Sequence, residues 1–501
     1  MVYYTGINTY SLGDKVKING YLEDFDNNTI FNLFNYKEYY LSKNIKYKIS
    51  TNDMELISKN RNVFNKFKTF LLKRIENLKK SQYIKTFILG DSRDIDDSIV
   101  ESYRLNGISH LFSVSGMHTA LLSSIILLIL NKIKKSKLNY MIVALLLLLF
   151  TFITNFTPSI IRASMLFIFV LLNKYLELRL STLKILIIIL LINININTYN
   201  IYNVSFQFSY VVTLFLILFN KIINNSKKYL SKIFFTSLIA FLSSIPIMIN
   251  NFFNINLMTI LNNLIFVPLV SLIIFPMSLI VLIIPKIDFI YSVLINILEC
   301  ISLFMCRFRI EIILCKIRLP IFLLYYVIII YVLNGIKKKN YKRTILIVIV
   351  LLIHTNINAF LSNTFITYID VGQGDSLLVH LSKNNGNILI DTGGKYNYNL
   401  SKNIISYLKS LGIKSIDYLV LTHGDYDHMG EAINLVNNFI VEKVIFNCGE
   451  YNDLEEELIK ILDKKKIKYY SCIKELNIDN NKLYFLQTKN YVNNTLMQFF
   501  M

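Results

Sequence analysis

A group of four metal-binding side chains lies near the C-terminal end of the sequence. His423, Asp425, Asp427 and His428 form the pattern His-x-Asp-x-Asp-His directly after an apolar run. Imidazole and carboxylate groups bind divalent cations, and two such cations can activate a water for attack on phosphorus. The pattern predicts a hydrolytic metal site that these four residues hold, with Asp427 as its catalytic residue.

The elements around this group predict an α/β domain over residues 362–501. Two stretches with strand patterns are followed by an amphipathic helix over 399–410 and by a further strand just before His423. Asp391 ends the second of the two stretches, and loops at strand ends commonly display metal ligands. We therefore include Asp391 among the predicted metal-site residues, where it either binds the metal or orients the ligands.

A second polar group, His110, Ser115, Gly116 and His118, lies within a long apolar segment. The two histidines are eight residues apart, about two helical turns, so one helix face would carry both imidazoles. Polar groups within a membrane need a partner or a water-filled path, so this face and the intramembrane cation Arg162 predict the lining of a pore. Arg162 should pair with a carbonyl, a carboxylate or a phosphate. In the alternative, these side chains only hydrogen-bond to neighbouring helices.

The apolar block over residues 109–361 must position this second group. Its aliphatic runs predict roughly nine to eleven membrane helices, because most of them are near the ~20 residues that cross a bilayer. The run over 257–284 fits either one tilted helix or a helical hairpin. The sequence is therefore that of a polytopic α-helical membrane protein. The predicted helices cover residues 109–130, 138–156, 158–173, 183–200, 204–223, 230–250, 257–284, 289–306, 321–333 and 344–361.

Positive charge is concentrated in this block and predicts its orientation. The formal net charge is +20, and the block contains 22 of the 53 Lys and Arg residues but only 4 of the 33 Asp and Glu residues. Such charge records membrane orientation, so it does not indicate a DNA-binding groove. We place the basic connections inside and both flanks outside, although the basic segment 307–318 would then also lie outside. The connections placed inside are 131–137, 173–184, 221–232 and 335–343.

The N-terminal flank predicts a small β-module over residues 1–60. Strand patterns occur at 15–25, 29–41 and 46–50, separated by turn residues. A generic β-meander is the alternative to a dedicated module.

Residues 61–108 predict an amphipathic helix and a linker. Apolar residues recur with a helical period between Val63 and Lys80, among several basic residues. This helix either lies on the membrane surface or packs on the β-module.

Residues 86–122, TFILGDSRDIDDSIVESYRLNGISHLFSVSGMHTALL, resemble the competence domain of ComEC-type DNA-internalisation channels. The resemblance extends over essentially the whole chain. It implies a plasma-membrane channel that conducts single-stranded DNA into the cytoplasm during natural transformation, together with a receptor and a cytoplasmic translocase. It also implies an OB-like form for the N-terminal module and leaves the oligomeric state open. Further matches follow in order at Pro158 with Arg162, at 206–209, at Pro246 and at 262–269.

The C-terminal pattern resembles the metallo-β-lactamase superfamily motif, with Asp425 where many members have histidine. The resemblance implies an extracytoplasmic metal-dependent nuclease domain. The oxygen ligand Asp425 favours manganese or magnesium over zinc, and we expect manganese rather than zinc or magnesium. His428 is the last histidine, and residues 490–501 resemble the start of a strand pair, so we expect a family member that is shortened at both ends. The isolated segment 362–501 is then expected to have little or no nuclease activity, and a domain that binds no metal is the alternative.

Other functions are not supported by the sequence. The GQGDS segment around Gly372 lacks the lysine and the helix of a P-loop, so we expect no ATP hydrolysis. The alternative to a channel is a membrane-anchored metallo-hydrolase whose helices serve only as an anchor.

The five cysteines show no CxxC spacing, so we expect neither a zinc ribbon nor disulfides; they are Cys300, Cys306, Cys315, Cys448 and Cys472.

Overall fold

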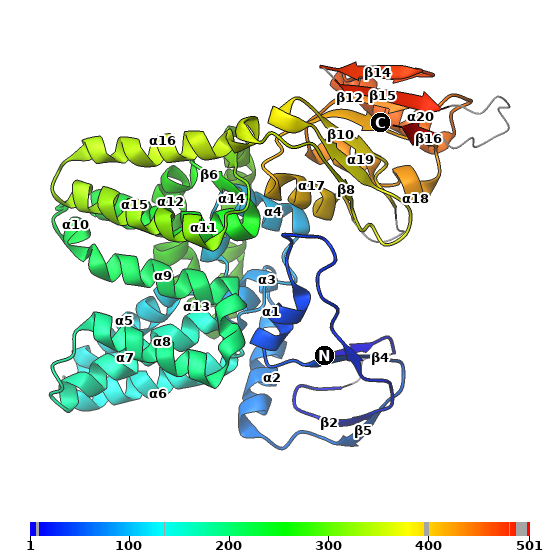
Figure 1. Ribbon diagram of the computed structural model, residues 1–501. Coiled ribbons are helices and arrows are strands. Elements are labelled where there is room, and N and C mark those ends of the chain that lie inside the picture. Colours follow the sequence, from blue (N-terminus) through cyan, green and yellow to red (C-terminus); the bar gives the residue numbers. More distant parts are fainter. Residues whose placement is uncertain (7–9, 135, 395–399, 480, 487–497, 501) are drawn as a thin grey trace.

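The computed structural model consists of a helical block with an N-terminal and a C-terminal flank. Both flanks lie on the same side of the block, and the short helix α10 (Asn220–Asn224) lies on the opposite side (Figure 1). The structure describes all residues except 7–9, 135, 395–399, 480, 487–497 and 501. The predicted basic residue Lys135, the start of the predicted helix at Asn399 and most of 490–501 lie outside the described residues.

Each predicted apolar segment coincides with helical structure, so the chain is a polytopic α-helical membrane protein. Among the described residues, six helices can cross a membrane by length and composition, namely Ser109–Ile133, Pro158–Tyr175, Tyr229–Phe252, Thr259–Ile283, Pro285–Phe308 and Leu319–Lys337. Three shorter apolar helices, α6, α8 and α9, accompany them. The helices of the block are α5 (Gly116–Ile133), α6 (Lys137–Ile153), α7 (Pro158–Tyr175), α8 (Thr182–Ile196), α9 (Val204–Leu218), α11 (Tyr229–Phe252), α12 (Thr259–Pro268), α13 (Phe275–Ile283), α14 (Asp288–Met305), α15 (Leu319–Lys337) and α16 (Thr344–Thr355).

The segment Thr259–Ile283 is one continuous helix and not a hairpin. α12 passes into α13 through a π-helical turn, Leu269–Ile274, directly after Pro268. Proline lacks the N–H that an α-helix would use, and a wider turn re-pairs the carbonyls around it. The structure therefore favours a single helix over a hairpin for residues 257–284, and its tilt in the membrane stays a prediction.

Both ends of this long helix lie near the flank side of the block. At its start, a Cβ on Gly107 would approach Thr259 Oγ1 to 2.1 Å. At its end, Arg74 Nε donates to the carbonyl of Leu282 at 2.6 Å. Arg74 belongs to α2 (Val63–Glu76), whose Lys68 also binds Asn155 in the connection between α6 and α7. The helix Thr259–Ile283 therefore runs across the ends of the neighbouring helices. Helix length alone does not give the number of membrane crossings.

The N-terminal flank contains two small sheets and a helix where a strand was predicted. Asn35 accepts the backbone N–H groups of Lys37 and Glu38 and begins α1 (Tyr36–Ser42). This cap favours a helix, so the predicted strand over 29–41 is wrong. The OB-like form stays a prediction. The sheets are β1 (Val2–Tyr4), β4 (Tyr47–Thr51) and β3 (Glu23–Asp24), and β2 (Lys15–Ile18) with β5 (Met54–Ser58).

Two asparagines between α8 and α9 join this flank to the helical block. Asn197 Nδ2 donates to the carbonyls of Leu41 and Ser42, each at 3.1 Å. Asn203 Nδ2 donates to Ser42 Oγ at 3.2 Å. These two asparagines therefore hold the end of α1 against the helical block.

The C-terminal flank is a six-stranded sheet between helices and a second sheet, which confirms the predicted α/β domain. In β10, Leu389 faces the helices α17, α19 and α20, whereas its neighbours Ile388 and Ile390 face the second sheet. Strands β10 to β13 are parallel, and β8 to β10 are antiparallel. The strand order is β13 (Lys468–Ser471), β12 (Val441–Phe446), β11 (Ile416–Val420), β10 (Asn387–Ile390), β9 (Leu377–His380) and β8 (Phe365–Tyr368). The other elements are α17 (Ser401–Ser410), α19 (Ala432–Asn438), α20 (Asp453–Lys465), β14 (Glu475–Ile478), β15 (Asn481–Leu486) and β16 (Gln498–Phe500).

The expectation of no disulfides is wrong, because Cys448 and Cys472 are bonded to each other. Their Cα atoms are 4.7 Å apart although 24 residues separate them in sequence. Each cysteine follows one of two neighbouring parallel strands, β12 and β13, so the sheet brings their ends together. Spacing in sequence does not reveal which strands are neighbours.

Helix α17 docks the C-terminal flank on the helical block. Lys409 Nζ lies 2.7 Å from Glu311 Oε1, and both side chains are largely buried. The N–H of Lys316 donates to the carbonyl of Ser410 at 2.8 Å. Both block residues lie in the connection between α14 and α15, which includes β7 (Glu311–Ile313). These two contacts therefore attach the domain that contains the predicted metal-site residues 423–428, here called the metal loop, to the helical block.

The ion pair at this joint predicts a pH dependence. Burial disfavours ionised Glu311, but the Lys409 ammonium and the Asn254 amide outweigh burial and lower the pKa of this carboxyl. A lowered folded pKa stabilises the folded state above the unfolded pKa of about 4.3, and this contribution is lost as pH falls through the folded value. We expect hydrogen exchange of residues 401–410 to rise below about pH 4. Glu311→Gln should weaken the joint at neutral pH and remove this pH dependence; an unchanged pH dependence would contradict the assignment.

Candidate metal centre and intramembrane polar cluster

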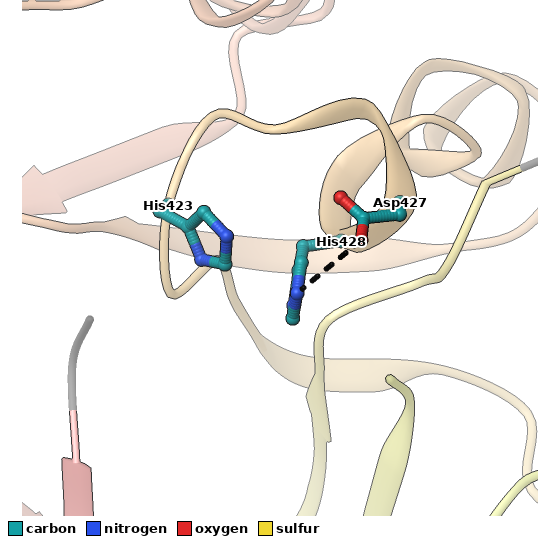
Figure 2. Close-up of side chains that lie close together, drawn as sticks. All are labelled: His423, Asp427 and His428. Carbon is teal, nitrogen blue, oxygen red and sulfur yellow. Dashed lines mark ion pairs between the residues drawn. The ribbon is translucent and has the colours of Figure 1, made fainter. Parts of the chain in front are cut away.

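His423, Asp427 and His428 gather in the loop after β11 (Figure 2). Each residue offers one ligand atom, and these atoms lie within 4.8 Å of one another. Asp427 and His428 come from the short helix α18 (Tyr426–Met429), and His428 Nε2 is 3.9 Å from Asp427 Oδ2. His423 is buried, while the other two residues are partly exposed. The group therefore opens to one side, where a substrate can approach.

Asp391, directly after β10, fixes the protonation of both imidazoles. Its Oδ2 accepts a hydrogen bond from His428 Nδ1 at 3.0 Å and one from Thr422 Oγ1 at 2.6 Å. Since the Thr422 hydroxyl gives its hydrogen to Asp391, its oxygen accepts the Nδ1–H of His423 at 2.9 Å. Both neutral rings then present an Nε2 lone pair, the form in which imidazole binds a metal.

This donor set fits a divalent metal. Two Nε2 lone pairs and the Asp427 carboxylate are three ligands, which leave further coordination positions for water or a substrate. The hydrogen bond to Asp391 outweighs burial and raises the pKa of His428.

Asp391 itself has a φ of +58°, a left-handed conformation that non-glycine residues adopt mainly at functional or strained positions.

Asp391 and Asp425 lie outside the three-residue group. Asp391 contacts the Nδ1 side of the ring of His428, away from the Nε2 lone pair, so its position is that of an orienting residue. Asp425 Oδ2 lies 3.6 Å from His423 Nε2, and its side chain is about half exposed at 48%. Metal binding by Asp425 stays a prediction.

Two residues that the sequence analysis missed, Asn452 and Glu455, hold the metal loop from the side of α20. Asn452 Nδ2 donates to the carbonyl of Gly424 at 2.7 Å, and Glu455 Oε2 accepts the N–H of Asn452 at 2.9 Å. Glu455 is only 2% exposed; burial first, and then the Asp425 carboxylate, raise its pKa. The spacing Asn-x-x-Glu before an apolar run is a capping box, the signal that could have found them.

Glycines allow the backbone of the metal loop to approach its neighbours. A Cβ on Gly374 would lie 1.6 Å from the carbonyl oxygen of Asp427, and one on Gly394 would lie 1.9 Å from that of Tyr426. Gly374 also has a φ of +86°, which favours glycine. The GQGDS segment thus packs on the loop 423–428 through Gly374, which explains this glycine without a P-loop.

We expect Asp391→Asn to weaken metal binding by about 10-fold to 100-fold, because outer partners of ligating histidines have effects of this size. The amide nitrogen cannot accept a hydrogen bond, so at least one imidazole loses its fixed protonation. Manganese titration of the full chain in nanodiscs, followed by electron paramagnetic resonance, measures this change. The matched control is Asp463→Asn, an exposed carboxylate on α20. Equal affinities of Asp391→Asn and the control would contradict the orienting role.

The prediction that His110 and His118 share one helix face is wrong, because the chain breaks between them. His110 lies in a short 3-10 helix, Ser109–Leu111, and is exposed, whereas α5 begins only at Gly116. His118 is fully buried, and its Nδ1 accepts the N–H of Ser115 at 3.2 Å. A side chain that caps its own helix start competes with continued helix, and periodicity cannot detect this.

Arg162 pairs with a carbonyl, one of its three predicted partners. It is 8% exposed in α7, and its Nη1 donates to the carbonyl of Ser209 and to Thr213 Oγ1, both in α9. Its Nη2 lies against the first residue of α5, since a Cβ on Gly116 would be 2.4 Å from it. The structure therefore brings Gly116 and Arg162 together, while the His110 side chain is exposed.

Comparisons with known proteins cover both groups of residues. The family model described as Competence protein matches residues 87–339, just over half of the chain, and the one described as Metallo-beta-lactamase superfamily matches residues 369–481. The chain is 25% identical over 485 residues to ComE operon protein 3 of Bacillus subtilis (strain 168). This similarity covers 89% of the chain, which spans 62% of the length of that relative.

Proposed function

Because the chain belongs to the competence protein family, we propose that it is a membrane channel through which single-stranded DNA enters the cytoplasm during natural transformation. The observation that carries this proposal is the polar group at the start of α5 and α7. The chain is not helical between Leu111 and Gly116. Non-helical backbone among membrane helices is tolerated where it is buried in protein or lines a water-filled cavity, and an anchor needs neither. A receptor and a cytoplasmic translocase are the expected partners, by family resemblance.

The C-terminal domain is proposed to be the metal-dependent nuclease part of the same protein. His423, Asp427 and His428 would hold the metal, Asp391 would orient the histidines, and manganese is favoured over zinc or magnesium. A bound divalent cation would supply a Lewis acid that lowers the pKa of water and stabilises charge on phosphorus. The partly exposed side chains of Asp427 and His428 leave the group open to a phosphodiester from one side.

Both flanks are proposed to face the extracytoplasmic side of the plasma membrane. They lie together on one side of the block, opposite the basic connection at α10, and basic connections face the cytoplasm (Figure 1). The Cys448–Cys472 disulfide supports this placement, because disulfides persist in oxidising compartments. Reporter fusions at Asn28 and Asn437 test it. A cytoplasmic signal from the second fusion would overturn the orientation.

A strain that lacks this protein tests the channel. We expect labelled donor DNA to fail to reach the nuclease-protected cytoplasmic pool, while binding at the cell surface continues. Normal accumulation in that pool would rule out the proposed function.

The competing function is a membrane-anchored metallo-hydrolase without a channel role, which the exposed metal group favours. Replacing His110, Ser115 and His118 separates the two functions. Loss of uptake with correct membrane insertion supports the channel, and unchanged uptake favours the anchor.

A further inference from the structure

The start of α5 presents hydrogen-bond donors without acceptors. The N–H of Ser115 can only donate, so the Nδ1 of His118 is the acceptor at 3.2 Å and the ring carries its hydrogen on Nε2. This buried Nε2–H has no hydrogen-bond partner within the described part of the chain. The first N–H groups of a helix, here those of Gly116 and Met117, also have no acceptor within the helix. The dipole of α5 adds partial positive charge at the same point.

The charge of Arg162 at this point is uncompensated. Among the described residues Arg162 forms no ion pair with a carboxylate, and its Nε–H is buried without an acceptor. Its Nη2 lies against Gly116, the first residue of α5. A buried cation among apolar helices is costly unless an anion joins it.

We propose that the start of α5 and Arg162 form a binding site for one phosphodiester group of the DNA strand. The backbone N–H groups of Gly116 and Met117 and the Arg162 guanidinium would hold its oxygens. This inference rests on the proposed uptake function and adds to it the group of the strand that the channel binds. All the assigned donors are N–H groups, and within the described part of the chain no carboxylate pairs with Arg162 to compete with a phosphate.

A DNA strand fits this site better than a membrane lipid does. Arg162 is buried between α7 and α9, so the lipid that surrounds the block does not reach it. Gly116 and Met117 are partly exposed, so a strand would reach them at the start of α5.

The test measures binding of a fluorescent single-stranded oligothymidylate to the full chain in nanodiscs by anisotropy. We expect Arg162→Gln to weaken binding roughly 10-fold to 100-fold, because hydrogen bonds to charged groups have effects of this size. The slope of log affinity against log salt should become shallower by about 0.7, the value for one lost phosphate contact on a single strand. An oligothymidylate with an uncharged methylphosphonate backbone should not distinguish the variant from the wild type.

Two variants and one control guard against misfolding. Arg162→Lys should retain most of the affinity and the salt slope, since it keeps the charge. Gly116→Ala should weaken binding, because its Cβ would lie 2.4 Å from Nη2 and displace the guanidinium. Lys174→Gln changes a cation in the last turn of α7, the helix of Arg162, and should bind the strand as the wild type does.

The outcomes separate this inference from the proposed function. If the wild type does not bind the strand, both are overturned. If it binds and Arg162→Gln binds equally well with the same salt slope, only the phosphodiester site is overturned. If native mass spectrometry shows that Arg162→Gln loses a bound phospholipid while strand binding is unchanged, the site belongs to a lipid phosphate and the inference is also overturned.

Discussion

Asp427→Ala is expected to lower the metal affinity of the full chain by more than about 100-fold, beyond the range for changes to outer partners of ligands. Asp427 supplies the carboxylate of the group, and its Oδ2 lies 3.9 Å from His428 Nε2. Without it, two neutral imidazoles would have to hold a divalent cation without a charged ligand. Manganese titration by electron paramagnetic resonance measures the loss, and cleavage of a fluorescent single strand should fall with it.

The matched control for this prediction is Asp425→Ala, which removes a carboxylate from the same loop. Asp425 lies outside the three-residue group and is about half exposed, so its loss should cost less. If Asp425→Ala lowers metal affinity as much as Asp427→Ala does, the three-residue description of the site is wrong.

Gly374→Ala is the second change with a large expected effect. The new Cβ would lie 1.6 Å from the carbonyl oxygen of Asp427, so the metal loop must move. The residue would also keep a φ of +86°, which adds strain of roughly 1–2 kcal/mol for a non-glycine residue. We expect metal binding to fall about as far as in Asp427→Ala, with a lower melting temperature of the C-terminal domain.

Gly372→Ala is the control that separates the contact of the new Cβ with Asp427 from the backbone strain of a positive φ. Gly372 has a φ of +78°, but no atom lies within 4 Å of the Cβ that alanine would add. This variant should therefore lose about the same 1–2 kcal/mol of stability and keep its metal affinity. Equal metal affinities of the two variants would show that the approach of Gly374 to the metal loop has no functional role.

The sequence predicts the helical block well because membrane helices depend on long apolar runs, which single residues do not mask. It also predicts the loop of His423, Asp427 and His428, since a turn after one strand brings ligands of near-adjacent positions together. The strand pattern around Asp391 places that residue near the loop but does not distinguish a ligand from an orienting residue. That distinction depends on the hydroxyl of Thr422, which no motif singles out.

Other features depend on contacts between distant segments. The helix is interrupted between His110 and Gly116 because the His118 side chain accepts the N–H of Ser115 at the start of α5. A hydropathy pattern does not show this hydrogen bond. The disulfide of Cys448 and Cys472 needs the order of strands in the sheet. The helix Thr259–Ile283 is long and apolar enough to cross a membrane, yet its ends contact Gly107 and Arg74 on one side of the block. The length and composition of a helix do not show where its two ends lie.

The most direct test of the channel is to capture the strand during its passage. A photo-crosslinking benzoylphenylalanine placed at Met117, beside the start of α5, should become attached to labelled donor DNA in cells that are taking it up. The same group at Leu128, which is 65% exposed on the outer surface of α5, should not. Attachment at Met117 alone is the predicted result. Equal attachment at both positions, or none at Met117 while uptake proceeds, would contradict a passage beside α5.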